Sequence, residues 1–416
     1  MTDPQSSRSV RYLGRVALNR VSGVKRCREC GRVTISAGGL VGVRAVARLG
    51  GGITSGYAGL ATCGRIWLCP VCNSKVMAYR SIEIGAVLSW AAAPEREALV
   101  IWGSLTCWHK SGDSLADLIQ IQREAWREVV QSELWKLWAA SQGGDRLGYI
   151  RASEITVGVN GWHPHFHPII IVRGSRAAAN WFAGRIRKLW IEAVGRAGGY
   201  ASDNDSQKLS VLDSFDAAVG IGGYVTKSQY SPQGLALEAV WSQSKNVPGR
   251  KPRVVGTLPH WSLLDAAGQG LAVEALSWWE LEEATHGHRM ITWSRGLRKL
   301  AGLGEEVADD VLAAKELGSI EDTVCVITPI GWRRVREVPG LQAGILDTLE
   351  QSGWLALRDL LDLHGIDWGT LDEAAPGFAG VHHYMQKPDK VVPSVGGHHP
   401  AQFDGEVLPS LLKLVK

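Results

Sequence analysis

The most regular hydrophobic pattern in the chain lies at residues 148–172, where two extended stretches flank the dipeptide Asn160-Gly161. The first stretch, 154–159, alternates polar and apolar residues, and the second, 162–172, ends in four consecutive aliphatic residues. Such runs predict strands, and Asn-Gly between them is the strongest short signal for a β-hairpin. We therefore expect an antiparallel pair of strands that turns at Asn160-Gly161.

Hydrophobic periodicity predicts further strands and helices around this hairpin. Apolar runs indicate two strands, and apolar positions with helical spacing indicate four helices. In chain order these elements cover residues 74–90 (helix), 99–107 (strand), 114–140 (helix), 175–196 (helix), 209–212 (strand) and 216–229 (helix). The aromatic residues of the helix at 175–196, Trp181 included, are expected in its core. The order of elements predicts an α+β domain with helices flanking a central antiparallel sheet.

The length of 416 residues suits two or three domains with sizeable cores. The pattern predicts domains at residues 1–95, 96–245 and 246–416. The first begins with an Arg-rich segment, 1–25, that we expect to be mobile. The second contains the hairpin and ends near the polar loop 241–251. The third is expected to be a mixed, mainly helical accessory region.

Charge is distributed unevenly, although the whole chain carries only +4. Residues 1–80 contain 13 Lys and Arg against only Asp3 and Glu29, which gives +11 and leaves −7 for the rest. Such a basic segment indicates a polyanionic partner, most simply nucleic acid. No apolar segment resembles a signal peptide or is long enough to span a bilayer. The expected location is therefore the cytoplasm, with no membrane partner.

Cysteines are concentrated in the basic segment. Cys27-x2-Cys30 and Cys69-x2-Cys72 can each supply two thiolates to one tetrahedral Zn²⁺. Cys63 is a fifth candidate, so spacing alone leaves open which four cysteines bind. We expect a structural zinc that folds the N-terminal module, because such sites contribute folding free energy directly.

Histidines with strand spacing occupy the second half of the hairpin. Because alternate side chains share a face, His165 and His167 point the same way while Phe166 points into the core. A two-residue turn at Asn160-Gly161 predicts that Glu154 lies opposite His167.

One carboxylate and two imidazoles are then expected to share one patch of the sheet. This mixture of ligands suits Mg²⁺, Mn²⁺ or Zn²⁺. The same turn predicts Thr156 opposite His165, and His163, which has the same strand parity, is an alternative ligand. The hairpin is therefore a candidate metal site.

A tyrosine and a lysine lie one turn apart on the helix predicted at 216–229. Tyr224 can act as a covalent nucleophile, and the Lys227 ammonium favours its phenolate and stabilises charge on a phosphate. Tyr230 lies six residues after Tyr224, which on a continuous helix turns it to another face. Tyr224 is therefore the favoured nucleophile.

Together these motifs resemble those of HUH-superfamily rolling-circle replication initiators, and most closely those of plasmid Rep proteins of actinobacteria. The likeness covers about residues 27–300. The motifs that carry it are Leu105-Thr106-x-x-His109, Glu154-x-Thr156 with Gly161-Trp162-His163-Pro164-His165-Phe166-His167, Tyr224-x-x-Lys227, the upstream Cys63 with Trp67-Leu68-Cys69-Pro70-Val71-Cys72, and the downstream Trp293-Ser294-Arg295-Gly296-Leu297-Arg298.

The resemblance implies an HUH endonuclease domain that nicks and rejoins DNA. Mg²⁺ or Mn²⁺, held by Glu154, His165 and His167, would polarise a scissile phosphate. Tyr224 would attack it and form a 5′-phosphotyrosine, with Lys227 stabilising the phosphate. The implied partners are plasmid origin DNA, recognised as a duplex and cleaved as a single strand, and a host helicase and polymerase.

One position departs from the family pattern. Some relatives carry a glutamate one helical turn before the tyrosine, used to activate water at termination, and this chain has Gly220 there. Asp216, Asp213 or Glu238 are candidates to replace it, and Tyr230 is a candidate second nucleophile.

Other functions fit parts of the same pattern. A His-x-His strand also occurs in amidohydrolase barrels, but the chain lacks the alternation of eight parallel strands with helices. A non-catalytic zinc DNA-binding protein would use the histidines structurally. An HUH transposase or relaxase would share the chemistry, although a relaxase usually places its tyrosine before the histidines.

Overall fold

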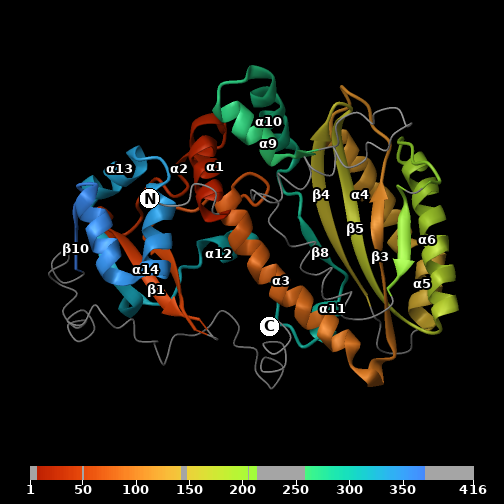
Figure 1. Ribbon diagram of the computed structural model, residues 1–416. Coiled ribbons are helices and arrows are strands. Elements are labelled where there is room, and N and C mark those ends of the chain that lie inside the picture. Colours follow the sequence, from red (N-terminus) through yellow and green to blue (C-terminus); the bar gives the residue numbers. More distant parts are fainter. Residues whose placement is uncertain (1–6, 49–50, 142–147, 205, 213–257, 371–416) are drawn as a thin grey trace, which may run out of the picture. The chain divides into compact units, whose positions relative to one another are not determined.

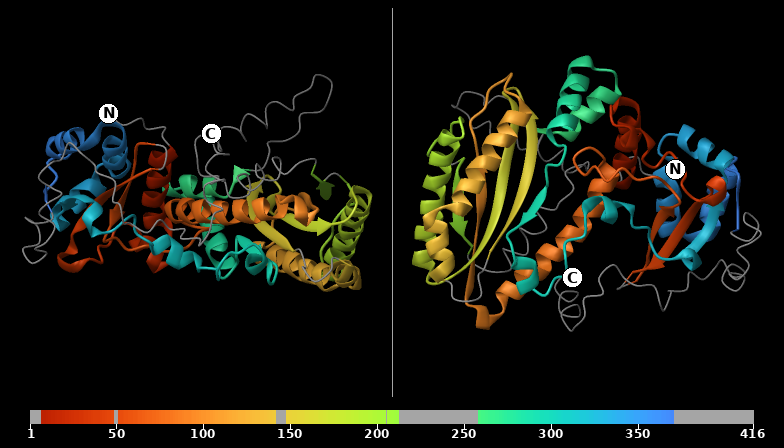
Figure 2. Two further views of the ribbon diagram at one scale, coloured as in Figure 1. Left: turned by 90° about the horizontal axis from the view of Figure 1, so that it is seen from below. Right: turned by 180° about the vertical axis from the view of Figure 1, so that it is seen from behind.

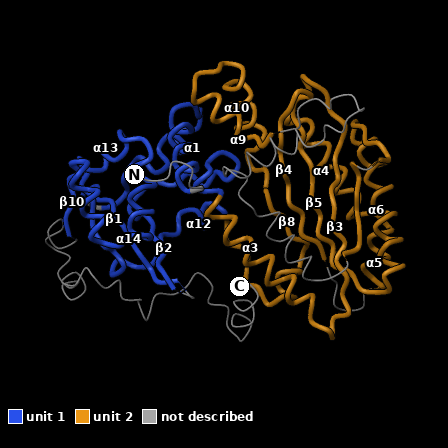
Figure 3. Tube along the Cα trace, in the orientation of Figure 1, with its two compact units in different colours: residues 1–73, 230–232, 309–405 blue, residues 74–229, 233–308, 406–416 orange. Residues whose placement is uncertain are grey.

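The computed structural model describes residues 7–48, 51–141, 148–204, 206–212 and 258–370. The described residues form two units, coloured separately in Figure 3. Unit 1 contains residues up to 73 and from 309 onward, and unit 2 contains the described residues between them. The division falls inside helix α3 (Pro70–Ala92). No helix in the described part of the chain has the length and apolar character needed to cross a membrane.

Unit 2 is built on an antiparallel sheet, as the sequence predicted. The strand order is β6-β3-β5-β4-β7, and β8 also pairs with β4. These strands are β3 (Ala98–Thr106), β4 (Tyr149–Gly158), β5 (Gly161–Arg173), β6 (Lys208–Val211), β7 (Leu258–Pro259) and β8 (Ile291–Trp293). The hairpin strands β4 and β5 therefore lie inside the sheet, where neighbours hold them on both sides.

Helices α4 (Leu115–Gln131) and α6 (Arg176–Arg196) cover one face of this sheet (Figure 1), and the view from behind in Figure 2 shows the same layer. Phe166 of β5 points into that layer and packs against Trp190, with ring centroids 5.9 Å apart. Strand alternation therefore turns His165 and His167 to the opposite face. The described residues of unit 2 also form most of α3 and the helices α5 (Glu133–Ser141), α9 (Trp261–Gly268), α10 (Ala272–Ala284) and α11 (Leu297–Leu300).

Two details of the helical layer differ from the sequence prediction. The helix expected at 114–140 begins as predicted, with Ser114 capping the Asp117 N–H, but it ends at Gln131 and a new helix starts after Ser132. Trp181, expected in the core, is 56% exposed. It lies one residue before Phe182, and that step rotates a helical side chain by about 100° away from the buried face.

The hairpin register also differs by two residues from the prediction. Gly158 pairs with Gly161, so the connecting residues are Val159 and Asn160. Gly161 takes a positive φ of 82°, whereas Asn160 does not, which excludes the mirror-image turn that Asn-Gly favours. Glu154 consequently lies opposite His165 instead of His167.

Unit 1 contains a four-stranded antiparallel sheet in the order β10-β9-β1-β2. Its strands are β1 (Val41–Ala47), β2 (Ile53–Ala58), β9 (Thr323–Ile327) and β10 (Trp368–Gly369). Its helices are α1 (Ser7–Val21), α2 (Lys25–Glu29), the start of α3, α12 (Asp309–Ala314), α13 (Pro329–Glu337) and α14 (Leu341–Leu363). Side chains of β1, β9, α13 and α14 share one buried core. The contacts thus join residues 309–370 to the N-terminal segment, unlike the three successive domains expected from the sequence.

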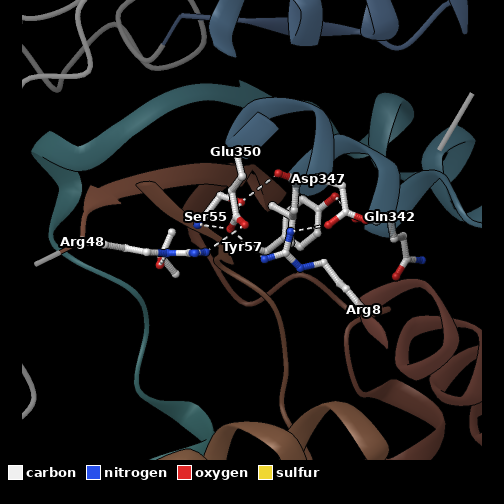
Figure 4. A network of polar contacts seen from close by, with 9 residues as sticks. Arg8, Arg48, Ser55, Tyr57, Gln342, Asp347 and Glu350 are labelled. Atoms are coloured by element: carbon white, nitrogen blue, oxygen red, sulfur yellow. Dashed lines mark hydrogen bonds and ion pairs between the residues drawn. The ribbon is translucent and has the colours of Figure 1, made fainter. Parts of the chain in front are cut away.

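The N-terminal segment, expected to be mobile, forms helix α1 from Ser7 onward and is tied to α14. Arg8 pairs with Asp347 at 2.6 Å and Glu350 at 2.7 Å (Figure 4). Glu350 also accepts hydrogen bonds from the backbone and hydroxyl of Ser55. Arg48 of the same network reaches Glu350 at 3.0 Å. Part of the basic charge of residues 1–80 is therefore neutralised by acidic residues from the far end of the chain.

Candidate functional site

Glu154, His165 and His167 converge on the sheet face that α4 and α6 leave uncovered. The Nε2 atoms of both histidines lie 2.9 Å from Glu154 Oε2. The three side chains are mostly buried, with exposures between 9% and 15%. The predicted convergence survives the register difference because a shift of two residues keeps every side chain on its own face.

Backbone carbonyls orient both imidazoles. His167 Nδ1 lies 3.1 Å from the Gly103 carbonyl, and His165 Nδ1 lies 3.2 Å from the His163 carbonyl. Each Nδ1–H can donate there, which leaves the Nε2 atoms directed toward Glu154 and able to bind a metal. The Trp102 ring lies nearly parallel to His167, with centroids 6.2 Å apart.

Electrostatics keep the carboxylate charged. Burial alone would raise the pKa of Glu154, but the charge and hydrogen bonds of His165 and His167 outweigh it and hold that pKa well below its usual range. Burial, together with the charges of His165 and His109, lowers the pKa of His163 to about 3. The site therefore offers an ionised carboxylate at Glu154, and His163 next to the group of three is neutral at neutral pH.

This donor set fits a divalent cation. An ion with octahedral ligands at 2.0–2.1 Å separates neighbouring ligand atoms by about 3.0 Å. The spacing of 2.9 Å between Glu154 Oε2 and each Nε2 is close to that value. All three ligand atoms lie within 4.8 Å of one another.

Two further histidines extend the site along the same face. His163 Nδ1 lies 2.7 Å from His109 Nε2, and His109 Nδ1 lies 3.0 Å from the Asn160 carbonyl. His163, which the sequence offered as an alternative ligand, lies outside the group of three. Through His109 it connects that group to the segment that follows β3.

A second candidate metal site lies in unit 1. The Sγ atoms of Cys30, Cys63, Cys69 and Cys72 lie within 4.8 Å of one another, and all four residues are buried. Three of the Sγ pairs are 3.7 Å apart. Tetrahedral zinc with Zn–S bonds of 2.3 Å requires about 3.8 Å between sulfurs, so the geometry fits zinc.

Cys63 takes the place that the paired spacing gave to Cys27. Cys27 is buried in α2 but does not join the group of four. Gly64, with a positive φ of 64°, follows Cys63 directly. The Cys-x2-Cys spacing does not predict this turn, so the sequence identified Cys63 only as a fifth candidate ligand.

An arginine that the sequence did not single out supports this cluster. The Arg15 side chain is buried, donates to Gln342 Oε1 at 2.6 Å and stacks on the Tyr12 ring. The pKa of Arg15 is affected first by burial, which lowers it, but the net shift is upward because Tyr12 and the cysteine thiolates oppose burial. Its positive charge would offset part of the excess negative charge of four thiolates around Zn²⁺.

Another residue missed from the sequence fixes the hairpin. Glu280 of α10 accepts hydrogen bonds from the Trp162 indole and the Leu115 N–H, both at 2.8 Å. The carboxylate thus joins the start of β5 to the start of α4. No local motif marks Glu280, because its partners come from distant segments.

Six candidate residues and the helix predicted at 216–229 lie outside the described residues. The six are the proposed nucleophile and the residues offered to assist or replace it, Tyr224, Lys227, Tyr230, Asp213, Asp216 and Glu238. Their roles stay predictions from the sequence.

Comparisons with known proteins identify relatives that bear the name Rep. The protein rep of Streptomyces lividans is 32% identical over 346 residues, covering 68% of this chain and 74% of the relative. The protein rep of Lentilactobacillus hilgardii is 27% identical over 131 residues, covering 30% of this chain and 40% of the relative. A neomycin resistance protein of Streptomyces cyanogenus is 36% identical over 140 residues, covering 28% of this chain and 31% of the relative.

No family model matches the chain, and no solved structure matches it. The likeness to the Streptomyces lividans protein extends over most of both chains. The chain therefore belongs to the plasmid Rep protein family.

Proposed function

We propose that this chain is a rolling-circle replication initiator that nicks and rejoins plasmid origin DNA by metal-dependent HUH chemistry. The observation that carries the proposal is the convergence of Glu154, His165 and His167 on one face of the sheet. Membership of the Rep family supports a role in plasmid replication. The order of the motifs in the sequence supports the finer assignment to the HUH class.

The site residues would prepare a phosphate for attack. A Mg²⁺ or Mn²⁺ ion bound there would polarise the scissile phosphate. The carbonyls of Gly103 and His163 hold the two imidazoles in one tautomer, so the ligand atoms need little rearrangement. Glu154 stays ionised and supplies the negative charge of the donor set.

Tyr224 is the proposed nucleophile. Its phenolic oxygen would bond to phosphorus, while the bond from phosphorus to the 3′ oxygen breaks and that oxygen takes up a proton to become a free hydroxyl. Lys227, three residues later in the sequence, would favour the phenolate. The phosphotyrosine ester keeps the energy of the broken bond, so the same site can rejoin strands. Tyr230 or Asp216 are proposed for the step that ends a round.

Exposed aromatic side chains beside the site suit a single-stranded substrate. Trp108 is 58% exposed and Tyr200 is 61% exposed, and the Trp108 N–H donates to the Tyr200 carbonyl at 2.6 Å. Trp108 directly precedes His109, which contacts His163. Aromatic rings of this kind stack on unpaired bases with little sequence preference.

The test is covalent capture of DNA. The purified chain is incubated with Mn²⁺ and a single-stranded oligonucleotide from the origin of its own plasmid, and adducts are separated under denaturing conditions. We expect an adduct at Tyr224 by mass spectrometry, none for Tyr224→Phe, and an initial yield near wild type for Tyr230→Phe.

His165→Ala and His167→Ala should also give no adduct while keeping the wild-type circular dichroism spectrum. A wild-type chain that forms no adduct with either Mg²⁺ or Mn²⁺ would refute the nicking mechanism. An adduct at Tyr230 would instead show that Tyr230 is the nucleophile, and the proposed mechanism would otherwise stand.

We further propose that the group of four cysteines holds a structural zinc. Such a site would stabilise unit 1 directly, because its ligands come from segments that the metal crosslinks. Metal analysis should find one tightly bound zinc per chain, lost in Cys63→Ser and retained in Cys325→Ser, which alters a buried cysteine outside the group.

A further inference from the structure

Two segments about 300 residues apart in sequence form one exposed surface of unit 1. Residues 32–35 follow the cluster cysteine Cys30, and helix α13 follows strand β9. A Cβ placed on Gly39 would lie 3.1 Å from Pro329, the first residue of α13, and 3.3 Å from the Thr34 hydroxyl. The two segments are therefore neighbours.

This surface carries three arginines, Arg32, Arg333 and Arg336. Arg333 and Arg336 lie one helical turn apart on α13, and burial, followed by the charges of Arg32 and Arg333, lowers the pKa of Arg336. Among the described residues, the buried Nε of Arg336 has no hydrogen-bond acceptor. An anion bound between these three like charges would relieve their mutual repulsion, which Glu337 offsets only in part.

Three other arginines of unit 1 are less suited to such a partner, because acidic residues already neutralise them. Arg8 pairs with Asp347, Arg44 with Glu316 at 3.1 Å, and Arg48 with Glu350. The charge of these three arginines is therefore balanced within unit 1 and contributes less to an external partner.

Apolar side chains accompany these arginines. Ile330 precedes Arg333 by one helical turn and is 70% exposed, and Ile35 is 67% exposed. The buried side of α13 is formed by Trp332 and Val335, so its arginine side faces outward. Guanidinium groups match phosphate geometry, and aliphatic groups contact sugars and thymine methyls, which together fit a nucleic-acid backbone and groove.

We propose that Arg32, Arg333 and Arg336, with Ile35 and Ile330 beside them, form the docking surface for duplex DNA of the plasmid origin. The identity of the DNA rests on the proposed function, whereas the surface itself is independent of the catalytic residues. Duplex DNA is favoured over a single strand because three fixed cations on a helix and a neighbouring loop match the regular phosphates of a rigid partner.

The cysteine cluster holds one half of this surface in place. The Gly31 N–H donates to the Ala61 carbonyl at 2.7 Å, and the Ala61 N–H donates to the Val33 carbonyl at 2.9 Å. Cys30 and Cys63 flank this pairing, so a metal bound to both would fix the backbone of Arg32. Loss of zinc should therefore weaken duplex binding as well as stability.

The experiment measures duplex binding by the full chain across salt concentration. Fluorescence anisotropy with an origin duplex, in EDTA-free buffer without added Mg²⁺ or Mn²⁺, is recorded from about 50 to 200 mM salt. Arg32→Gln, Arg333→Gln and Arg336→Gln should each weaken binding and each lower the salt slope by about 0.9, the value for one lost phosphate contact.

Arg358→Gln is the matched control, since Arg358 is an exposed arginine of unit 1 that already pairs with Asp359 at 3.1 Å. It should bind as wild type does. All three test variants should keep the wild-type melting temperature and zinc content, and should attach to a single-stranded oligonucleotide at the wild-type rate.

Unchanged duplex affinity and salt slope in the three variants would overturn the proposal. The proposal would also be overturned if the three variants lost binding to single-stranded DNA, or to anionic vesicles, while their duplex binding stayed intact. If the wild-type chain bound duplex DNA through these arginines but never formed a covalent adduct, the docking surface would stand and the nicking mechanism would fall.

Discussion

At the scale of single residues, the candidate metal site depends on one carboxylate shared by two histidines. Glu154 lies 2.9 Å from both Nε2 atoms, and each histidine is oriented from behind by a carbonyl. Removing the carboxylate takes away a ligand and the negative charge that balances the cation, while the ring orientation remains.

Glu154→Gln should therefore weaken Mn²⁺ binding by more than about tenfold, since even second-shell changes cost 10–100-fold. Isothermal titration of Mn²⁺ into each variant measures the effect. Glu133→Gln, at an exposed position of the same unit, should bind as wild type does. Equal affinities for wild type and Glu154→Gln would remove Glu154 from the site.

A buried histidine of unit 2 makes stability depend on pH. Burial, together with the charges of Arg151 and Arg123, lowers the pKa of His288 to about 3. The unfolded chain takes up this proton near pH 6.5, so stability is fully present above that pH and falls as the pH drops toward 3.

The loss should be on the order of 1 kcal/mol for each pH unit within that window. Urea unfolding from pH 7 to 4 should therefore give a shallower pH dependence for His288→Gln than for wild type. His286→Gln, at an exposed position nearby, should match wild type. Parallel curves for His288→Gln and wild type would contradict the assignment.

Much of the site could be predicted from single residues, because strand parity and ligand type are local properties. His165, His167 and Glu154 share a face in any register that differs by an even number of residues. Cys63 could be ranked only as a possibility, since its approach to the other cysteines depends on a turn at Gly64. Glu280 and Arg15 could not be predicted, because burial and distant partners define their roles.

At the scale of elements, glycines at positive φ decide where segments turn and pack. Gly31 has a φ of 65°, and a Cβ there would lie 2.2 Å from Arg15 Cζ. Gly52 has a φ of 78° with no atom within 4 Å of the added Cβ. An alanine at Gly52 would introduce backbone strain alone, whereas an alanine at Gly31 would also clash with Arg15 beside the cysteine cluster.

Gly31→Ala should lower the stability of unit 1 and its zinc retention, whereas Gly52→Ala should cost only the strain of about 1 kcal/mol. Thermal melting and zinc release to a chelator measure the two effects. Similar losses in both variants would show that Arg15 moves aside freely.

Hydrophobic periodicity predicted well whether a segment is a helix or a strand. It predicted the boundaries of these elements and the pairing of the strands less well. The strand at 98–106 and the helix at 176–196 were expected within a residue or two. The hairpin turn was displaced because Gly161, not Asn160, takes the positive φ. Periodicity alone does not distinguish these two turns, since both keep the same faces buried.

At the scale of the whole molecule, unit 1 is built from the two ends of the described chain. Strand β9 pairs with β1, and α14 fills the core beneath the sheet. The sequence offers no sign of this pairing, because strand partners so far apart are chosen by tertiary packing.

A chain that ends at residue 308 should therefore fail to fold unit 1. It would lack buried residues such as Ile345, Leu349 and Leu357 and would leave the edge of β1 unpaired. We expect loss of zinc retention and aggregation, measured by metal analysis and size-exclusion chromatography. A truncated chain that kept its zinc and stayed monomeric would show that residues 309–370 are dispensable.

The pairing of β1 with β9 also sets the order in which a newly made chain becomes complete. Val43 pairs with Cys325, so at about 5–20 residues per second roughly 15–60 seconds separate the synthesis of the two partners. The histidine hairpin leaves the ribosome before α13 does. An unfinished chain that ends before α13 would thus carry the metal ligands without the arginines of α13, and under the docking proposal it would not compete for the origin duplex.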